Sequence, residues 1–589
     1  MPATTDVPIV KIEGIAAFAT GLQSVTVRRS LNSVGHAQIR VRADDTDAGK
    51  AKVEAKLSLS IAVDGGREAV LFAGEVVTVG IELRRMGAEL VIDAYDKAHQ
   101  LMRRAPVKTH LEQKPSDIIR TIVEEAGLTA SVADFGAQHD VYHQSGPAGE
   151  CVAELCRAFG AEWWVEGDTF RVRKRTTSPP ASGVSLRAGE SLRTFNVRYT
   201  AGEQVQNQGV RGWDVASKSA IVGTAVGVTT PLSGGPSSFT PATGRQDARF
   251  WSPLVVDVES ANVLSAGAAS HAGAAVVTGR GECDAEPAIV PGATIAVDGL
   301  GPEWNGDYYV TGVEHLVGID QPFITRFTIG GSDEGSLLDL LGDRGAAPMR
   351  QLLQGLTIGL VTNNKDAEES LKLNRVKVKF PYLSDTDESE WARVVVPGGG
   401  HSRGLMQLPE QDDEVLVGFE NGDRNKPVVL GGLWNGSDPP PVDSASPELL
   451  DGTKVASRQW VSRQGHRVAL FDKHDDGEQI LIELKDKKTF VKLVKDTGIV
   501  VNAKDQDIEI TNDKSSIKLA SNGDITIKGA KITIEGTGDI SVEGVNVKAT
   551  GKANMNLEGK AQFTAKGGGK VGIESSGMTE IKGTLVKVN

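Results

Sequence analysis

Apolar and polar residues alternate along most of the first hundred positions of the chain. A period of two places the apolar side chains on one side of an extended strand. The pattern therefore predicts a β domain with one buried face. Two runs show it most clearly: Ala37, Ile39 and Val41, and then Leu57, Leu59, Ile61 and Val63.

Helical patterns interrupt the predicted strands at three places. An apolar stripe with helical spacing follows Pro115 and ends at Gly127, and a second one runs from Val152 to Gly160. An alanine-rich helical stretch covers residues 261–277, between strand patterns that continue to about Gly330. Residues 1–331 are therefore predicted to form two β-barrel-like domains with small helical insertions.

A small all-β domain is predicted between two linkers. Residues 332–354, with Gly335, Gly342, Gly345 and Pro348, are predicted to be the first linker, and a second one, rich in Pro and Ser, begins at Asn435. Residues 355–440 carry short apolar strands in the number and length typical of an OB-fold barrel. The predicted strands are Leu356–Val361, Arg375–Phe380, Trp391–Val396, Glu414–Phe419 and Pro427–Leu433.

The last hundred residues consist of a repeat of about eight residues, each with an apolar pair at i and i+2. So short a strand cannot bury two branched side chains alone, so the repeats must stack on one another or on other chains. Because Phe563 is the only aromatic residue after Phe490, the core is narrow, which favours a three-chain β-prism over a monomeric β-solenoid. Residues 491–589 are therefore predicted to form a trimeric β-helix. Its predicted trimer core includes Ile508, Ile510, Ile517, Leu519, Ile525, Ile527, Ile532, Ile534, Ile540 and Val542.

Composition excludes several classes of protein. Hydrophobic residues at 39% and charged residues at 24% of the 589 positions are typical of globular proteins, which excludes collagen and disorder. The formal net charge of -13 would repel a phosphate backbone, so no nucleic acid partner is expected. No apolar run approaches the length of a spanning helix, and we expect synthesis in the cytoplasm without a signal peptide. Cys151, Cys156 and Cys283 form no even framework and are expected to be reduced thiols.

A series of motifs within residues 359–436 resembles the barrel of the valine-glycine repeat (VgrG) spike proteins. The segment Ser462–His466, followed by the eight-residue repeats, is similar to the neck and needle of that family. Residues 1–331 resemble the family's hub through their strand order and through the helix and hairpin at Val152–Val172. The barrel motifs are Gly359-Leu-Val-Thr-Asn-Asn-Lys-Asp366, Asn374-Arg-Val-Lys-Val-Lys-Phe-Pro381, Trp391-Ala-Arg393, Leu408-Pro-Glu410, Asp413-Glu-Val-Leu-Val417 and Val429-Leu-Gly-Gly-Leu-Trp-Asn-Gly436.

The resemblance implies a homotrimeric spike at the tip of a contractile injection machine, such as a phage tail, a type VI secretion system or an extracellular phage-tail-like particle. The hub would dock on the inner tube and baseplate, the barrel would form a collar, residues 441–490 would form a neck, and the needle would pierce the target membrane mechanically. Effector cargo and a small tip protein of the proline-alanine-alanine-arginine (PAAR) kind are further implied partners. The spike would assemble in the cytoplasm and be ejected or released on firing.

The point of the needle is the expected docking surface for the tip protein. We expect no domain beyond Asn589, and the last histidine, His474, lies too far from the end to build a metal-binding tip. Three copies of the final strand would leave open backbone edges, which invite pairing with another chain. The predicted docking residues are Ile581, Leu585, Val586 and Val588.

Two pairs of residues could suggest a metal or redox site. His139 and His143 stand four apart, but no His-Glu-x-x-His pattern accompanies them, so we expect an exposed loop or a strand pair. Cys151 and Cys156 do not converge like a Cys-x-x-Cys pair, and core packing is expected for Cys156.

Other polar clusters also have structural interpretations. The acidic run Asp385, Asp387, Glu388 and Glu390 lacks the glycine and glutamate of a calcium loop and predicts a solvated loop. The glycines at 398–400 and 567–569 lack the lysine and serine of a phosphate loop and predict turns. The needle acids, Glu509, Glu535 and Glu543, flank inward apolar positions and should lie on the outer face. We expect no catalytic residue, no metal and no cofactor.

The sequence therefore favours a structural, non-enzymatic spike trimer that penetrates mechanically and carries cargo. Two alternatives come from other classes: a β-helical polysaccharide-degrading tail enzyme and a trimeric receptor-binding tail fibre. An enzyme would require a groove with aromatic platforms, which the aromatic-poor needle argues against. A fibre would require a globular receptor head, for which we expect no residues beyond the needle.

Overall fold

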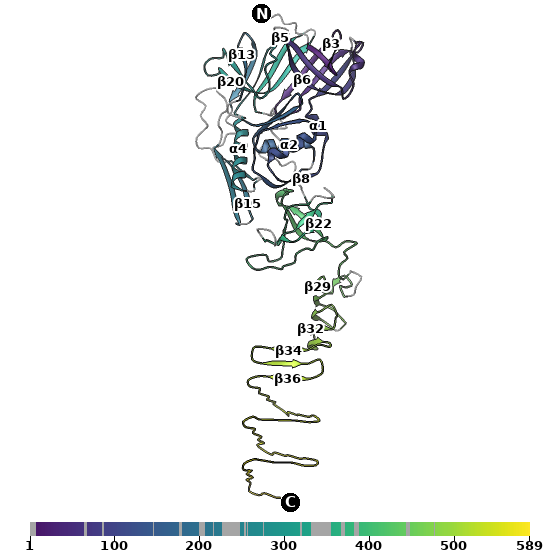
Figure 1. The fold of residues 1–589 in the computed structure, drawn as a ribbon, viewed down its shortest axis with the longest axis vertical. Coiled ribbons are helices and arrows are strands. Elements are labelled where there is room, and N and C mark those ends of the chain that lie inside the picture. The colour runs from purple at the N-terminus through teal and green to yellow at the C-terminus, as the bar shows by residue number, and fades with distance from the viewer. Residues whose placement is uncertain are drawn as a thin grey trace. The chain divides into compact units, whose positions relative to one another are not determined.

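The computed structural model divides the chain into two compact units, Met1–Pro439 and Pro440–Asn589, and each is described by itself. The fold is mainly β (Figure 1). Among the described residues, no helix has both the length and the apolar character needed to cross a membrane. The predicted linker at 332–354 lies outside the described residues. The structure describes residues 8–63, 67–84, 87–144, 146–175, 179–199, 207–215, 217–226, 248–251, 255, 257–274, 276–318, 321–331, 355–366, 372–381, 388–442, 448–475 and 477–588.

The first β domain is built from strands β1 to β7. The predicted alternation is confirmed, because Ala37, Ile39 and Val41 are fully buried and Leu57, Leu59 and Ile61 are almost fully buried. These residues belong to one apolar core that also contains Phe18 and Phe72. The strands are β1 (Pro8–Ile12), β2 (Ile15–Ala17), β3 (Leu22–Ser30), β4 (His36–Arg42), β5 (Lys56–Val63), β6 (Arg67–Arg84) and β7 (Gly87–Tyr95), with a 3-10 turn at Ala48–Lys50.

The second β domain follows an insertion of helices and strands, called the helical insertion below, and has its own apolar core. Tyr308 and Phe327 lie at the centre of this core, together with Val310 and Ile329. Its elements are β13 (Ala181–Arg187), β14 (Leu192–Tyr199), β18 (Val277–Asp284), β19 (Thr294–Asp298), β20 (Gly306–Gly318) and β21 (Gln321–Gly330). Between β14 and β18, a separate three-stranded sheet of β15 (Asn207–Asp214), β16 (Ser219–Val226) and β17 (Ala248–Trp251) and the helix α4 (Val258–Ala274) contribute to the core of the helical insertion.

The two β domains share one sheet. Strand β20 pairs antiparallel with β3, and this pairing joins both domains in a single sheet of 13 described strands. On its outer face, Glu314 accepts a hydrogen bond from Arg28 at 2.6 Å and lies 3.4 Å from Arg326, which in turn contacts Glu282 at 3.0 Å. The junction is therefore made by backbone pairing and by a row of alternating charges.

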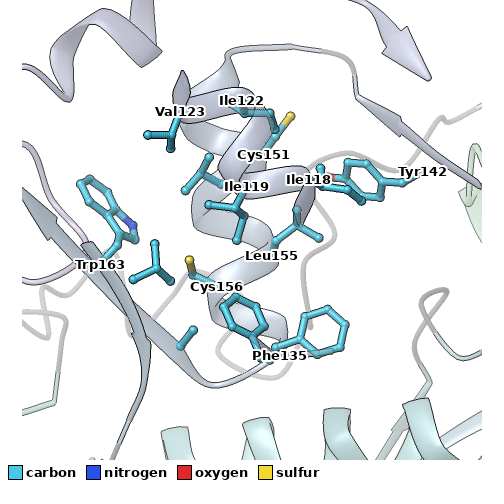
Figure 2. Packing of buried hydrophobic residues seen from close by; sticks show 14 of the residues in the cluster. Ile118, Ile119, Ile122, Val123, Phe135, Tyr142, Cys151, Leu155, Cys156 and Trp163 are labelled. Carbon is cyan, nitrogen blue, oxygen red and sulfur yellow. The ribbon is translucent and has the colours of Figure 1, made fainter. Parts of the chain in front are cut away.

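The helical insertion packs around a third apolar core (Figure 2). Helix α2 begins with Pro115 at its first turn, and it buries Ile118, Ile119, Ile122 and Val123, as its apolar spacing predicts. These side chains meet helix α3 and Trp163 on strand β11. The elements are α1 (His99–Arg103), β8 (Lys108–Gln113), α2 (Pro115–Glu125), β9 (Thr129–Val132), β10 (His139–Gln144), α3 (Ala148–Ala158), β11 (Ala161–Glu166) and β12 (Thr169–Lys174).

The small β domain is a closed five-stranded barrel, as predicted. Its strand order is β23-β22-β25-β26-β24, and an antiparallel bridge between Val376 and Ala392 closes the ring. The two bridge hydrogen bonds measure 3.0 and 2.7 Å. The strands are β22 (Thr357–Asn363), β23 (Lys377–Lys379), β24 (Arg393–Val394), β25 (Glu414–Phe419) and β26 (Pro427–Gly432), and a 3-10 turn at Glu420–Gly422 follows β25.

The second unit contains two antiparallel meanders. We call β29–β33 the neck sheet, and β34–β36 the needle sheet. The boundary suggested at residue 490 falls within β32, so the neck sheet includes the first predicted needle residues. The strands are β27 (Leu450–Asp451), β28 (Lys454–Val455), β29 (Ser457–Val461), β30 (Arg467–Phe471), β31 (Gln479–Glu483), β32 (Thr489–Val494), β33 (Gly498–Ala503), β34 (Ile508–Thr511), β35 (Ser516–Leu519) and β36 (Ile525–Lys528).

Candidate assembly surface

The needle sheet separates apolar and polar side chains onto opposite faces. Ile517 pairs directly with Ile510 on one side and Ile527 on the other, and Leu519 pairs in the same way with Ile508 and Ile525. Because neighbours in a strand point to opposite faces, these six apolar residues share one face. The other face is polar and carries Glu509, Thr511, Ser516, Lys518, Thr526 and Lys528.

The apolar face of the needle sheet is open in the single chain. Ile510, Ile517 and Ile527 remain between 41% and 66% exposed, and only Ile508 is partly buried. The other predicted core residues are also exposed: Leu519, Ile525, Ile532, Ile534, Ile540 and Val542. One chain therefore does not cover the surface that the repeats create.

The repeats after Lys528 differ from the strands that the sequence predicts. Residues 529–588 are all described, yet no strand is assigned within them. The chain instead runs back and forth without backbone partners of its own (Figure 1). A strand needs a neighbour for its hydrogen bonds, and in this stretch a single chain provides none. The predicted tip residues Ile581, Leu585, Val586 and Val588 lie here and are 51% to 89% exposed.

The neck sheet presents a second open apolar face, which the sequence analysis did not identify. Along one row, Val468 pairs with Trp460 and Ile482, and Val491 continues the row to Val501. A parallel row contains Leu470, Ile480, Leu493 and Ile499, with Arg458 at its end. All nine apolar side chains are at least 38% exposed. The sequence does contain a signal for this face. Val468 and Leu470, and likewise Ile480 and Ile482, are spaced two residues apart, as the apolar pairs of the needle are.

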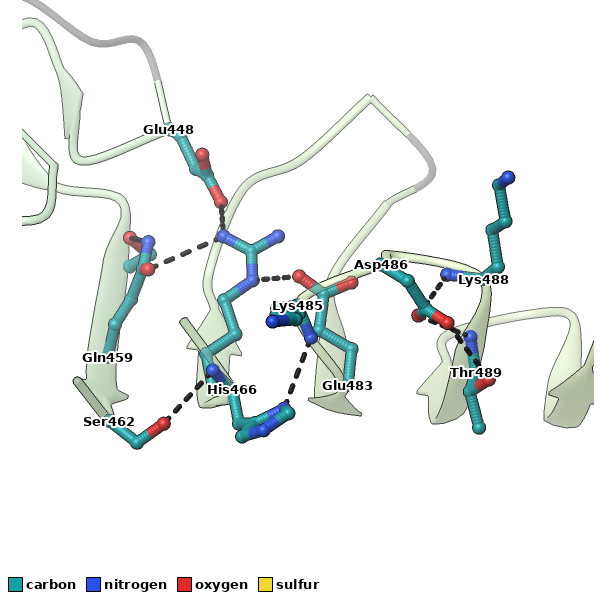
Figure 3. A network of polar contacts seen from close by, with 11 residues as sticks. Glu448, Gln459, Ser462, His466, Glu483, Lys485, Asp486, Lys488 and Thr489 are labelled. Atoms are coloured by element: carbon teal, nitrogen blue, oxygen red, sulfur yellow. Dashed lines mark hydrogen bonds and ion pairs between the residues drawn. The ribbon is translucent and has the colours of Figure 1, made fainter. Parts of the chain in front are cut away.

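The opposite face of the neck sheet carries a small buried apolar core and, beside it, a polar network (Figure 3). Arg467 forms ion pairs with Glu483 and Glu448 and donates a hydrogen bond to Gln459 Oε1 at 3.4 Å. Its guanidinium also lies 5.6 Å from the centre of the Phe471 ring. This face satisfies its charges within the chain, so the apolar face is the one left for other chains.

The network continues along the edge of the neck sheet. The backbone N–H of Lys485 donates to His466 Nδ1 at 3.2 Å, and the N–H of His466 donates to Ser462 Oγ at 3.1 Å (Figure 3). Asp486 accepts hydrogen bonds from the N–H groups of Lys488 and Thr489 at 2.9 and 3.1 Å. These bonds fix the tight connections, which align the strands that carry the apolar rows.

His139 and His143 lie on strand β10, not on a helix. Strand β10 pairs antiparallel with β8, so the expected strand pair is present, and His139 is buried in it against Phe159, with the ring centres 6.2 Å apart. The side chain of His143 contacts Thr109 Oγ1 at 2.9 Å. Within the described part of the chain, no group of three or more His, Cys, Asp or Glu side chains could hold a metal ion.

The three cysteines are buried free thiols. Cys156 lies in the core around α2 and α3, as predicted, and burial raises the pKa of its thiol well above the ordinary range. Burial and nearby carboxylates raise the pKa of Cys283 to about 12. Thiols with such pKa values are poor nucleophiles, so these residues pack rather than react.

The remaining candidate clusters have structural roles where they are described. Asp385 and Asp387 lie outside the described residues, whereas Glu388 accepts a hydrogen bond from Thr362 Oγ1 at 2.8 Å. Gly398 has a φ of +67° in a turn, as expected for that glycine run. Glu509 pairs across the sheet with Lys518 on the polar face, whereas Glu535 and Glu543 lie in the exposed stretch without assigned strands.

Two families of protein domains match the chain. The family described as the Alg8 N-terminal domain matches residues 6–318, which is more than half of the chain. The family described as the type VI secretion system/phage-baseplate injector OB domain matches residues 357–434. The second match coincides with the closed barrel β22–β26.

Curated relatives are type VI secretion system spike proteins. VgrG1c of Pseudomonas aeruginosa is 29% identical over 222 residues, which cover 36% of this chain and 28% of the relative. VgrG3 of Vibrio cholerae is 30% identical over 142 residues, which cover 23% of this chain and 14% of the relative. The matches thus span less than a third of the length of these relatives.

A solved structure supports the fold over most of the chain. The VgrG-containing structure titled the Francisella PdpA-VgrG complex, lidded, matches with a TM-score of 0.53 and 8% identity, over 85% of this chain and 81% of that chain. The low identity limits this match to the fold. The two domain families and the curated relatives lead to one assignment: the chain belongs to the Alg8 N-terminal domain family and resembles spike proteins of the VgrG type.

Proposed function

We propose that this chain is the central spike of a contractile injection machine and that it acts as a homotrimer. The observation that carries the proposal is the open apolar face of the neck and needle sheets. Trp460, Ile482 and Ile517 on these faces are 52%, 54% and 41% exposed in one chain. Exposed apolar patches of this kind mark interaction surfaces. Symmetry-related copies of the same rows are the simplest complementary partners, because each row would meet its own equivalent.

Trimer formation would also provide the backbone partners that residues 529–588 lack. Each extended repeat would pair with strands of the other two chains, and its Ile or Val pair would point to the common axis. Full burial of one such side chain contributes about 1.5–3 kcal/mol. A needle tied together in this way resists bending and unfolding under load, which a piercing element requires.

The partners follow from the spike assignment. We propose that the two β domains dock on the inner tube and baseplate, and that the exposed residues Ile581, Leu585, Val586 and Val588 receive a PAAR-like tip protein. Effector cargo would be carried on the assembled spike. The role is mechanical and not enzymatic. Glu509 is the one of the three predicted needle acids that lies on a strand, and it pairs with Lys518 on the polar face instead of facing a second carboxylate.

Light scattering on the purified chain tests the oligomeric state. We expect a mass of about 187 kDa, three times the 62.3 kDa of one chain. A monomer at micromolar concentration would contradict the proposal. The functional test is a deletion strain complemented with the chain lacking residues 504–589: particles or sheaths should assemble, but target cells should survive.

The absence of enzymatic activity is tested separately. Purified trimer should release no soluble fragments from peptidoglycan or capsular polysaccharide. A turnover that disappears when one carboxylate is replaced by its amide would favour the tail-enzyme alternative. Binding of the isolated needle to whole target cells, saturable and competed by a surface glycan, would favour the receptor-binding fibre.

A further inference from the structure

The helical insertion and the barrel meet at a contact that contains buried acidic groups. The backbone N–H of His143 on β10 donates to Asn425 Oδ1 at 2.8 Å, and Arg424 donates to the carbonyl of His143 at 3.3 Å. Lys426 donates to the carbonyl of Val255 at 3.3 Å. The β25–β26 loop is therefore held by three hydrogen bonds to residues more than 170 positions away.

Two carboxyl groups face this contact without full hydrogen bonding. Glu154 on α3 has a buried Oε2 atom, and Asp423 in the β25–β26 loop has a buried Oδ2 atom, and neither atom has a hydrogen-bond partner among the described residues. The other oxygen of Asp423, Oδ1, does have partners, because it accepts hydrogen bonds from the backbone N–H and the side-chain amide of Asn425 at 3.0 and 3.1 Å. An ionised carboxylate that is buried in such a place loses its hydrogen bonds to water, and the protein replaces only some of them.

The charged groups around the two carboxyls do not cancel the effect of burial. Burial raises the pKa of Glu154 to about 7, although Arg424 and Arg157 favour ionisation, and Asp423 and Glu150 add to the rise. Burial raises the pKa of Asp423 to about 6, against Asn425, Lys426 and Arg424. Tyr142, which faces the same contact from β10, has no charge in this pH range, since burial raises its pKa well above its ordinary value.

We propose that the contact between the helical insertion and the barrel loop takes up protons as it forms, so that it is tight in mildly acidic medium and loosens in alkaline medium. A carboxyl whose pKa is raised in the closed state stabilises that state below its ordinary pKa, and the stabilisation is lost as the pH rises through the raised value. The stabilisation is therefore lost between the ordinary and the raised pKa values, and its last part is lost between pH 6 and pH 8.5. Barrel and hub would form one rigid body at the acidic end of this window and would be able to separate at the alkaline end.

The size of the effect follows from the raised pKa values. If opening of the contact returns the pKa of Glu154 to its ordinary value, the equilibrium constant for opening rises about tenfold between pH 6 and pH 8.5. The same change for Asp423 adds about a factor of two, because its raised pKa lies near the lower end of the window. Glu154 is thus the principal titrating group.

The amide of His143 reports on the contact directly, since its N–H is bonded across it to Asn425. Hydrogen exchange of the full-length protein, followed by mass spectrometry on peptides covering residues 142–150 and 420–427, should be measured between pH 6 and pH 8.5 and corrected for intrinsic exchange. We expect the protection in these peptides to fall about twentyfold across the window in the wild type. Glu154→Gln should leave only about a twofold fall, and Asp423→Asn about a tenfold fall.

Glu124→Gln is the matched control, because it removes an exposed carboxylate from the neighbouring helix α2 and should behave like the wild type. Constant protection in the wild type, or a Glu154→Gln variant with the wild-type pH dependence, would overturn the proposal. If Glu154→Gln opens the contact at every pH, Asp423→Asn decides: a retained tenfold dependence supports the proposal, and a flat profile contradicts it.

Discussion

Ile517→Asp places a carboxylate at the centre of the apolar face of the needle sheet. Ile517 pairs with Ile510 on one side and with Ile527 on the other, so the new charge has only apolar neighbours on its face. In the single chain the position is 41% exposed, and the aspartate can be hydrated there. In a trimer the three symmetry-related aspartates would meet in a dry interior. The substitution should therefore act on assembly and much less on the single chain.

The magnitude has two parts. Trimer formation would bury the remaining 41% of Ile517, which contributes about 1 kcal/mol per chain. Keeping the aspartate neutral at pH 7 costs about 4 kcal/mol per chain, because about three pKa units separate pH 7 from its ordinary pKa. Over three chains the loss is about 15 kcal/mol, and most of it depends on pH. Since the pKa of the aspartate is raised in the trimer, the trimer should recover as the pH falls toward 4.

Sedimentation velocity and thermal melting at pH 7 and pH 4 measure both parts. Thr526→Asp is the matched control, because Thr526 lies opposite Lys518 on the polar face of the same sheet. We expect the control to remain a trimer with a melting temperature within a few degrees of the wild type. If Ile517→Asp and Thr526→Asp assemble and melt alike, the apolar face does not form the trimer interior.

Three further predictions concern the neck, the barrel and the thiols. Ile482→Lys, at the centre of the neck face between Val468 and Val491, should lower the trimer fraction in light scattering while the needle variant Thr526→Asp leaves it unchanged. Asp366→Asn should destabilise the barrel by about 2–4 kcal/mol in urea unfolding, since the carboxylate accepts bonds from two backbone N–H groups at 2.7 and 3.0 Å and pairs with Arg375 at 2.7 Å. Burial tends to raise the pKa of Asp366, but Arg375 holds it below its ordinary value, so this stabilisation should be present above about pH 4 and lost on further acidification. Cys151, Cys156 and Cys283 should resist alkylation at pH 8 in the native protein and all react in urea, and rapid native labelling of Cys156 would contradict its burial.

Local patterns in the sequence predicted the individual elements well. Helix α2 follows Pro115 and buries the four apolar residues that its spacing selects, β4 buries each alternate residue, and β5 buries Leu57, Leu59 and Ile61. The barrel strands were also found, because each is a short apolar run bounded by turn residues. These features depend on interactions within a few residues, which a single sequence displays.

Features that depend on distant partners could not be predicted in the same way. The pairing of β20 with β3 and the bond from His143 to Asn425 join residues more than 280 positions apart, and no local spacing encodes them. Burial of His139 against Phe159, across the insertion, likewise depends on a contact that no local spacing shows. The apolar rows of the neck, in contrast, do have a local pattern in the sequence, because apolar and polar residues alternate there. They were not predicted because the nearby Pro and Ser residues indicated a linker.

The pairing of β20 with β3 also sets an order of events during synthesis. Arg28 and Glu314, which meet across this junction, are separated by 286 positions. At about 5–20 residues per second, a ribosome needs roughly 15 to 60 s to deliver the second strand after the first. Throughout this delay one edge of β3 is unpaired and open to other nascent chains. The needle is translated later still, so this 13-stranded sheet can close on its own chain before the proposed trimer surface has been made.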